Sequence, residues 1–137
     1  MDTREIPIET GSRRGVFDLT DACRRFLAEV AGGRDGLLHV FVPHATAGVA
    51  LMELGSGSEG DLMDALDAVL PRDDRWRHAH GSRGHGADHL LPALVSPTVT
   101  IPVIGGAMQL GTWQSVALVD PNGDNPRRRV RLSFLPG

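Results

Sequence analysis

Residues 37–53 read LLHVFVPHATAGVALME, and the architecture expected for the whole chain builds outward from this segment. Its two apolar runs, over residues 37–42 and 48–53, are typical of buried strands. The small residues between them, from His44 to Gly48, indicate a turn, so we predict that the two strands pair antiparallel. His44 opens this turn and is therefore expected at an end of the sheet.

Hydrophobic periodicity in the flanking sequence predicts an α+β fold, a sheet with helices on one face. Helices are expected over residues 18–31, 58–70 and 88–94, and further strands over residues 4–9, 98–103, 115–120 and 128–134. Asp18 or Thr20 is the expected N-cap of the first helix, and Gly32-Gly33 ends it. Pro7 marks the first strand as an edge strand. The polar connection 71–86 is long for a structureless link, which is typical of a functional loop.

Size and composition are typical of one domain spanning residues 1–137, and no linker, repeat or low-complexity tract divides it. Hydrophobic residues make up 41% of the chain, but no apolar run approaches the roughly 20 residues that cross a bilayer, and no basic-then-apolar leader is seen. We therefore expect a soluble, cytoplasmic protein with no membrane partner. The single cysteine, Cys23, fits a reducing compartment, and its apolar neighbours at helical spacing predict a buried structural thiol.

The formal net charge of −3 gives no general attraction to nucleic acid, so no nucleic-acid partner is expected. Positive charge gathers near the C-terminus in Arg127-Arg128-Arg129 and Arg131, but these residues alternate with apolar ones in a strand pattern. Few aromatic side chains are available to stack on bases. This segment therefore favours a small anion, such as a small phosphorylated molecule, over a polynucleotide.

Three histidines, His44, His80 and His89, have small or polar neighbours in the least strand-like part of the chain. Neutral imidazoles are good ligands for zinc or a similar divalent metal ion, and three of them with an open fourth position form a reactive site. We expect these three to converge on one ion, because a turn at a sheet end, a long loop and a helix start can meet in space. The alternatives are a turn-capping role for His44 and solvated positions for His80 and His89. His78 and His85 are possible additional ligands, but surface positions are favoured for both.

Carboxylates and polar side chains elsewhere supply further candidates. Glu53 ends a strand and is suited to act as a general base or to orient a metal-bound water, although a solvated strand end explains it nearly as well. The candidates for anion binding are Thr46, Gln114 and Arg127. Arg127 follows a rigid proline, which suits a fixed phosphate contact, and a salt bridge between subunits is the alternative. Trp113 is expected to pack in a core that has few aromatics.

A series of motifs runs in order over nearly the whole chain: His44-Ala45-Thr46-Ala47-Gly48 with Glu53, Asp61, Pro71, His80, Ala87-Asp88-His89-Leu90, Ile101-Pro102-Val103, Gly106, Leu110-Gly111-Thr112-Trp113-Gln114 and Asp124-Asn125-Pro126-Arg127. This series resembles the YjbQ family, also called the secondary thiamine-phosphate synthase family. The Leu-Gly-Thr-Trp-Gln string is the most specific part, and the order of the motifs is the strong signal.

The resemblance implies a two-layer α+β fold with a curved, mostly antiparallel, half-barrel-like sheet, assembled as a homotrimer with active sites near subunit boundaries. It also implies a weak thiamine-phosphate synthase activity, which joins a pyrimidine-methyl diphosphate to a thiazole phosphate with loss of pyrophosphate and needs a divalent cation. A catalytic role for Asp61 comes from the resemblance, since the dipole of a helix start explains that residue by itself. The chain departs from the family pattern at His85, usually asparagine, and at Asn125, usually glycine.

Two classes of function remain open from the sequence. The first is a metal-dependent enzyme acting on a small phosphorylated substrate, either a thiamine-phosphate synthase-like transferase or a phosphoester enzyme. The second is a non-catalytic trimer that binds a metal ion or a small anion.

Overall fold

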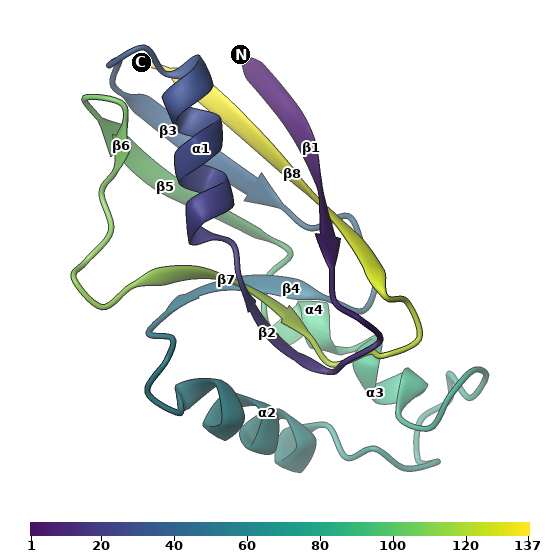
Figure 1. Cartoon of the computed structure of the whole chain (residues 1–137). Helices are drawn as coiled ribbons and strands as arrows, with labels where there is room; N and C mark the ends of the chain where they lie inside the picture. The colour runs from purple at the N-terminus through teal and green to yellow at the C-terminus, as the bar shows by residue number, and fades with distance from the viewer.

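Every strand of the protein pairs antiparallel with its neighbours, in two hydrogen-bonded sheets (Figure 1). The computed structural model describes all residues from Met1 to Gly137. Its elements are β1 (Asp2–Glu9), β2 (Gly15–Asp18), α1 (Thr20–Val30), β3 (Gly36–Phe41), β4 (Gly48–Met52), α2 (Ser58–Val69), α3 (His85–Asp88), α4 (Leu91–Leu94), β5 (Thr98–Ile104), β6 (Ala107–Met108), β7 (Ser115–Asp120) and β8 (Arg127–Pro136). One sheet has the order β1-β8-β3-β5-β6 and the other β2-β7-β4. The expected α+β class with a curled, antiparallel, half-barrel-like sheet is confirmed.

Local signals in the sequence placed most of these elements. β1 lies at an edge of the five-stranded sheet, as Pro7 indicates. The carboxylate of Asp18 accepts a hydrogen bond from the backbone N–H of Thr20 at 2.9 Å, and Gly32 leaves α1 with a positive φ of 57°. β2 and β6 were not predicted, because four and two residues are too few to show a period. The helix expected over 88–94 is instead two separate single turns, α3 and α4.

The predicted pairing of the two strands within residues 37–53 is wrong. β3 lies between β8 and β5, whereas β4 pairs with β7 in the other sheet. The segment between them crosses from one sheet to the other and is held there by backbone hydrogen bonds, Val42 N–H to Pro97 O and Val49 N–H to Ser96 O, both 2.8 Å. At the crossing Gly48 has no room for a side chain, because a Cβ would collide with the carbonyl of Val95. The turn is thus a crossover between sheets.

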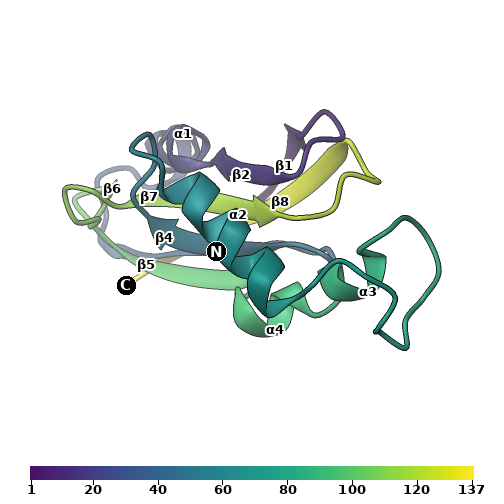
Figure 2. The ribbon, with the colours of Figure 1, turned by 90° about the horizontal axis from the view of Figure 1, so that it is seen from below.

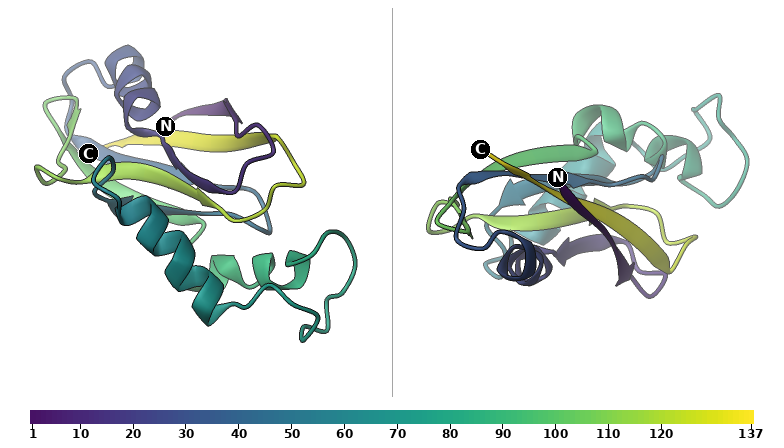
Figure 3. Two further views of the ribbon diagram at one scale, coloured as in Figure 1. Left: turned by 60° about the horizontal axis from the view of Figure 1, so that its bottom comes forward. Right: turned by 90° about the horizontal axis from the view of Figure 1, so that it is seen from above.

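Helices cover both faces of the three-stranded sheet, so the expectation that they share one face is also wrong (Figures 2 and 3). α1 packs Phe26 and Leu27 into the main core between the two sheets, against Val116 and Leu118 of β7. On the opposite face, Val119 belongs to a smaller cluster with residues of α2 and α4. The alternation of side chains along β7 allows both contacts. None of the helices has the length and apolar composition needed to cross a membrane.

A buried ion pair connects the two sheets. Asp120, at the end of β7, is fully buried. Its carboxylate accepts hydrogen bonds from Arg128 of β8, from Nε at 2.7 Å and from Nη2 at 2.9 Å. Arg128 Nη2 also donates to Thr46 Oγ1 at 3.0 Å, in the crossover. Three segments therefore meet at one guanidinium group. A buried carboxylate tolerates this position because its counter-charge and hydrogen bonds are both supplied.

We expect Arg128→Ala to lower the free energy of unfolding by about 3–5 kcal/mol, because it leaves the Asp120 carboxylate buried without a counter-charge. The matched control is Arg127→Ala, whose side chain is 82% exposed and pairs only loosely with Glu9 at 3.5 Å. Arg127→Ala is expected to lower the free energy of unfolding by less than about 1 kcal/mol. Chemical denaturation of both variants measures the difference, and equal stabilities would contradict the role given to the ion pair.

Cys23 is expected to be chemically inert in the folded protein. Its side chain is completely buried on α1, and burial raises the pKa of the thiol to about 12. Because the thiolate is the reactive form, a disulfide reagent at pH 8 should label the native protein slowly and the denatured protein at once. Rapid, stoichiometric labelling of the native protein would show that the α1 core opens easily.

Candidate metal centre

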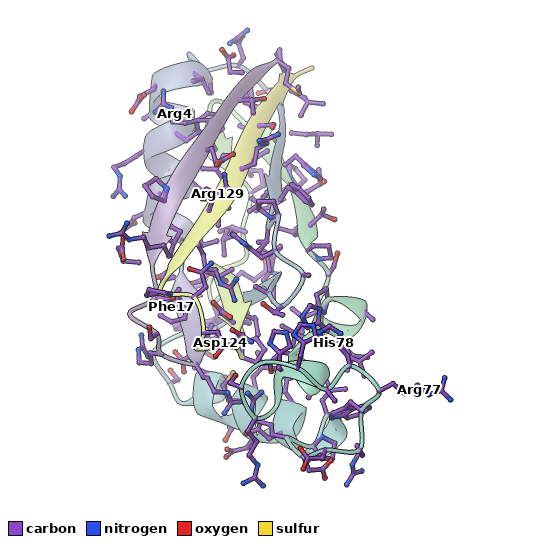
Figure 4. All side chains as sticks on the ribbon, turned by 90° about the vertical axis from the view of Figure 1, so that its right-hand side faces the viewer. Arg4, Phe17, Arg77, His78, Asp124 and Arg129 are labelled. Atoms are coloured by element: carbon purple, nitrogen blue, oxygen red, sulfur yellow. The ribbon has the colours of Figure 1, made fainter.

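The connection between α2 and α4 carries four histidines whose rings lie together, and Figure 4 labels His78 among them. His78 and His80 lie in the loop, His85 is the first residue of α3, and His89 follows its last residue. The spacing of four residues places His85 and His89 on the same side of this helical turn. Two loop residues and one turn of helix thus supply all four imidazoles.

Three of the imidazoles bring ring nitrogens close together, and the ring of His89 lies beside them. One ring nitrogen from each of His78, His80 and His85 lies within 4.8 Å of the others. The ring centroids of His78 and His80 are 4.1 Å apart, and those of His78 and His89 are 4.2 Å apart. His85 Nε2 and His89 Nε2 are separated by 3.0 Å. Ligand nitrogens at about 2.0–2.1 Å from a tetrahedral zinc ion are separated by roughly 3.4 Å, so the rings need to move closer together to bind such an ion.

Polar contacts, with little apolar packing, give the loop its shape. Arg72, just after α2, forms an ion pair with the buried Asp88 of α3 and donates a hydrogen bond to the Arg83 carbonyl at 3.1 Å. Arg83 Nε donates in return to the Arg72 carbonyl at 3.0 Å. Gly84, at a φ of 84°, leaves space for the Arg72 guanidinium, which a Cβ would occupy. The loop therefore closes on itself between residues 72 and 88.

The surroundings favour the neutral form of two of these imidazoles, those of His89 and His78. Desolvation lowers the pKa of His89, and repulsion by the neighbouring imidazoles of His78 and His85 adds to the effect. Desolvation also lowers the pKa of His78, and there the added repulsion comes from His80 and His85. Burial raises the pKa of Asp88, although the ion pair with Arg72 opposes it. Neutral imidazole is the form that binds a metal ion.

The structure brings together two of the three histidines that the sequence singled out. His80 and His89 lie in the cluster, but no group of converging ligand atoms includes His44. Its Nε2 accepts a hydrogen bond from the backbone N–H of Arg129 at 2.9 Å, and desolvation, followed by the Arg128 charge, lowers its pKa. The expected convergence of His44 with the other two is therefore not found.

His78 and His85, for which the sequence favoured surface positions over a role as additional ligands, both take part in the cluster; His78 is exposed there and His85 is half-buried. The signal that could have found them is spacing. Two histidines separated by one residue in a loop, and two separated by four, are arrangements in which neighbouring rings can share an ion. That spacing becomes informative only once α3 is known to form.

The remaining candidates lie outside this cluster. Glu53 is exposed and accepts a hydrogen bond from Ser56 Oγ at 3.1 Å, and Asp61 is exposed in the first turn of α2. Thr46 is buried beside Arg128. Gln114 Oε1 accepts the N–H of Gly111 at 2.8 Å, so its side chain closes its own loop. None of the four lines the hollow that contains His78, His80 and His85.

Arg127 and Trp113, for which the sequence predicted an anion contact and a core position, are both exposed. Arg127 extends into solvent beside Glu9 on the β1–β8 pair. Trp113 is 73% exposed in the loop before β7, so the prediction that it packs in the core is wrong. The other tryptophan, Trp76, is half-buried in the histidine loop, and its Nε1 donates a hydrogen bond to the Pro71 carbonyl at 2.8 Å.

Comparison with known proteins agrees with this architecture. The model of the family described as UPF0047 protein YjbQ-like matches residues 4–137. A UPF0047 protein of Mycobacterium tuberculosis is 63% identical over 137 residues, covering 100% of both chains. One of Methanothermobacter thermautotrophicus is 36% identical over 133 residues, 96% of this chain and 90% of that protein. A hypothetical protein from Aeropyrum pernix has a crystal structure that superposes with a TM-score of 0.90, at 31% identity and full coverage of both chains. The chain therefore belongs to the UPF0047 family of YjbQ-like proteins.

Proposed function

We propose that the histidine cluster binds a divalent metal ion, zinc or a similar one, and that the protein is a metal-dependent enzyme acting on a small phosphorylated molecule. The observation that carries the proposal is the convergence of three imidazole nitrogens within 4.8 Å at an open surface. Three neutral nitrogen ligands with a position left for water or substrate are the arrangement of catalytic zinc sites.

The donor set fits a transition-metal ion on chemical grounds. Every converging ligand is an imidazole, which suits zinc, copper, iron or nickel and suits magnesium or calcium poorly. The buried Nδ1 of His85 is the one buried side-chain nitrogen or oxygen without a hydrogen-bond partner. An unsatisfied polar atom beside such a cluster is what a missing ion or its supporting contact leaves behind.

A phosphorylated substrate suits the surroundings of the cluster. The hollow of about 480 Å³ beside the imidazoles is lined mainly by polar residues, and Arg83 is one of them. A bound metal ion would supply a Lewis acid for a phosphoryl oxygen, and Arg83 is the cationic lining residue that could pair with phosphate charge. The family resemblance makes thiamine-phosphate synthesis the first reaction to test.

A non-catalytic trimer that binds a metal ion or a small anion is the second candidate. The observation that favours it is the position of the two candidate catalytic carboxylates. Neither Glu53, the candidate general base, nor Asp61, whose catalytic role comes from the family resemblance, lines the hollow. If the protein is an enzyme, either a second copy of the chain supplies carboxylates to the site or residues other than Glu53 and Asp61 act as acid and base. A trimer that only binds its ligand needs no acid–base groups at the site.

We expect the purified protein to bind one equivalent of zinc or a similar ion per chain. His85→Ala and His80→Ala should each weaken binding by more than about tenfold, or ~1.4 kcal/mol, because each removes one ligand. His44→Ala is the matched control, since His44 bonds to the backbone of Arg129 and stands outside the cluster. Elemental analysis and competition with a chelator measure both quantities. Loss of the ion in His44→Ala with retention in His85→Ala would contradict the assigned ligands.

The two candidate functions separate in one assay series. With a panel of small phosphate esters and the two thiamine-phosphate precursors, an enzyme should show turnover that disappears in His85→Ala and after chelation. A non-catalytic protein should bind phosphate-containing molecules in calorimetry without consuming them. Turnover that is unaffected by chelation and by His85→Ala would contradict the proposed enzyme.

Self-association is expected through the outer face of the five-stranded sheet, where Leu37 lies in register between Leu135 and Pro102. Leu37 and Leu135 are 43% and 40% exposed, and an apolar row of this kind is typical of an interface. Light scattering should give about three times the 14.7 kDa of one chain, and Leu37→Asp should dissociate the assembly. Val69→Asp, which charges an equally apolar but separate position on α2, should not. A parent protein that runs as a monomer would refute the assembly.

A further inference from the structure

One ring nitrogen of the histidine cluster is buried without a hydrogen bond. His85 Nδ1 is buried and unpaired, although the carboxylate of Asp124 lies close by, with Oδ2 at 3.4 Å. The other ring nitrogen, Nε2, faces His89 Nε2 at 3.0 Å. The two nitrogens of His85 therefore point to different surroundings: one toward a carboxylate and one toward the other imidazoles.

Asp124 belongs to a distant segment, the turn between β7 and β8, and other contacts hold its carboxylate in place (Figure 4). Ser82 Oγ donates to Asp124 Oδ2 at 2.8 Å, and Asn122 Nδ2 approaches the same oxygen at 3.4 Å. The Asp124 backbone N–H donates to Asn122 Oδ1 at 2.9 Å. The contacts with Ser82 and Asn122 therefore hold Asp124 in position beside His85.

The turn that carries Asp124 is itself tied to α3. Asn122 is buried and donates to Asp88 Oδ2 at 2.9 Å, and Asp88 pairs with Arg72 at the start of the histidine loop. The carboxylate of Asp124 and the imidazole of His85 thus approach each other from two segments that one hydrogen-bond network joins. Their proximity is a product of the fold and does not depend on flexible surface side chains alone.

We infer that Asp124 is a positioning residue for His85, accepting a hydrogen bond from its Nδ1–H and so leaving the Nε2 lone pair free for a metal ion. This inference rests on the proposed metal centre and names the residue that prepares its ligand. An imidazole that donates one N–H to a carboxylate is fixed in tautomer and ring orientation and becomes a more basic ligand through its other nitrogen. A small rotation of His85 closes the present 3.4 Å separation into a hydrogen bond.

The test compares metal affinity in variants of the full-length protein. Asp124→Ala should weaken zinc binding by about 10- to 100-fold, the usual effect of removing a partner of this kind. Asp124→Asn, which keeps an oxygen acceptor but loses the charge, should restore part of the loss. Asp74→Ala is the control, because Asp74 is an acidic residue of the same hollow whose side chain forms no hydrogen bond or ion pair. It should bind zinc as the parent does.

Two readouts separate positioning from simple damage to the fold. Cobalt(II) substituted for zinc should give a visible absorption spectrum that shifts in Asp124→Asn, because the geometry at His85 changes. The effect of Asp124→Asn on affinity should also vanish in a His85→Asn background, since the two residues act as a pair. The melting temperature of the metal-free protein should be the same for Asp124→Asn and the parent.

The outcomes are distinguishable. Equal zinc affinity and an unchanged cobalt spectrum in Asp124→Asn overturn the inference while the metal centre stands. An equal effect of Asp124→Asn with and without His85 also overturns it. A parent protein that binds no zinc, cobalt or related ion refutes the metal centre itself.

Discussion

The ion pair between Asp120 and Arg128 is the contact on which the rest of the structure depends. It joins the end of β7 in one sheet to the beginning of β8 in the other, and Thr46 of the crossover completes it. Burying these charges is costly unless both are paired and hydrogen-bonded, so the arrangement tolerates little displacement. The turn that follows Asp120 begins at this fixed point. Because that turn carries Asn122 and Asp124, the ion pair also sets the position of the groups behind the histidine cluster.

The histidine cluster stands on a loop that has almost no hydrophobic core of its own. Its shape comes from a chain of polar contacts, Arg72 to Asp88, Asp88 to Asn122 and Asn122 to Asp124. Such networks hold a loop in one geometry when every member finds a partner. One atom of this region has no hydrogen-bond partner. It is His85 Nδ1, which faces the carboxylate of Asp124. An incomplete contact at this place is consistent with a site that reaches its final geometry when an ion binds.

Membership of the UPF0047 family accounts for the fold, while the proposed chemistry depends on local residues. In this chain a histidine, His85, occupies a position at which the resemblance leads one to expect asparagine. The substitution adds an imidazole beside His89 and gives Asp124 a ring nitrogen to bind. The carboxylates Glu53 and Asp61 lie elsewhere on the chain, away from the hollow. The proposed enzyme could therefore use these carboxylates only if another chain of the assembly brought them to the hollow. Ion binding by the histidine cluster needs only one chain.

The sequence alone determined the class of fold, the limits of most helices and strands and the importance of the 71–86 loop, because periodicity, capping and glycine positions act over a few residues. It also led to the hypothesis that histidines of this loop bind an ion, and His80 and His89 lie in one cluster of rings. The pairing of the strands was not predicted correctly from the sequence. The short turn after β3 resembles the turn of a hairpin, but β4 pairs with β7 in the other sheet. The membership of the histidine cluster was not predicted correctly either, because His78 and His85 lie with His80 and His89 whereas His44 does not. Only the tertiary structure decided these points, because the path of a polar loop follows from contacts such as Arg72 with Asp88 and Asn122 with Asp124, between residues that no local pattern relates.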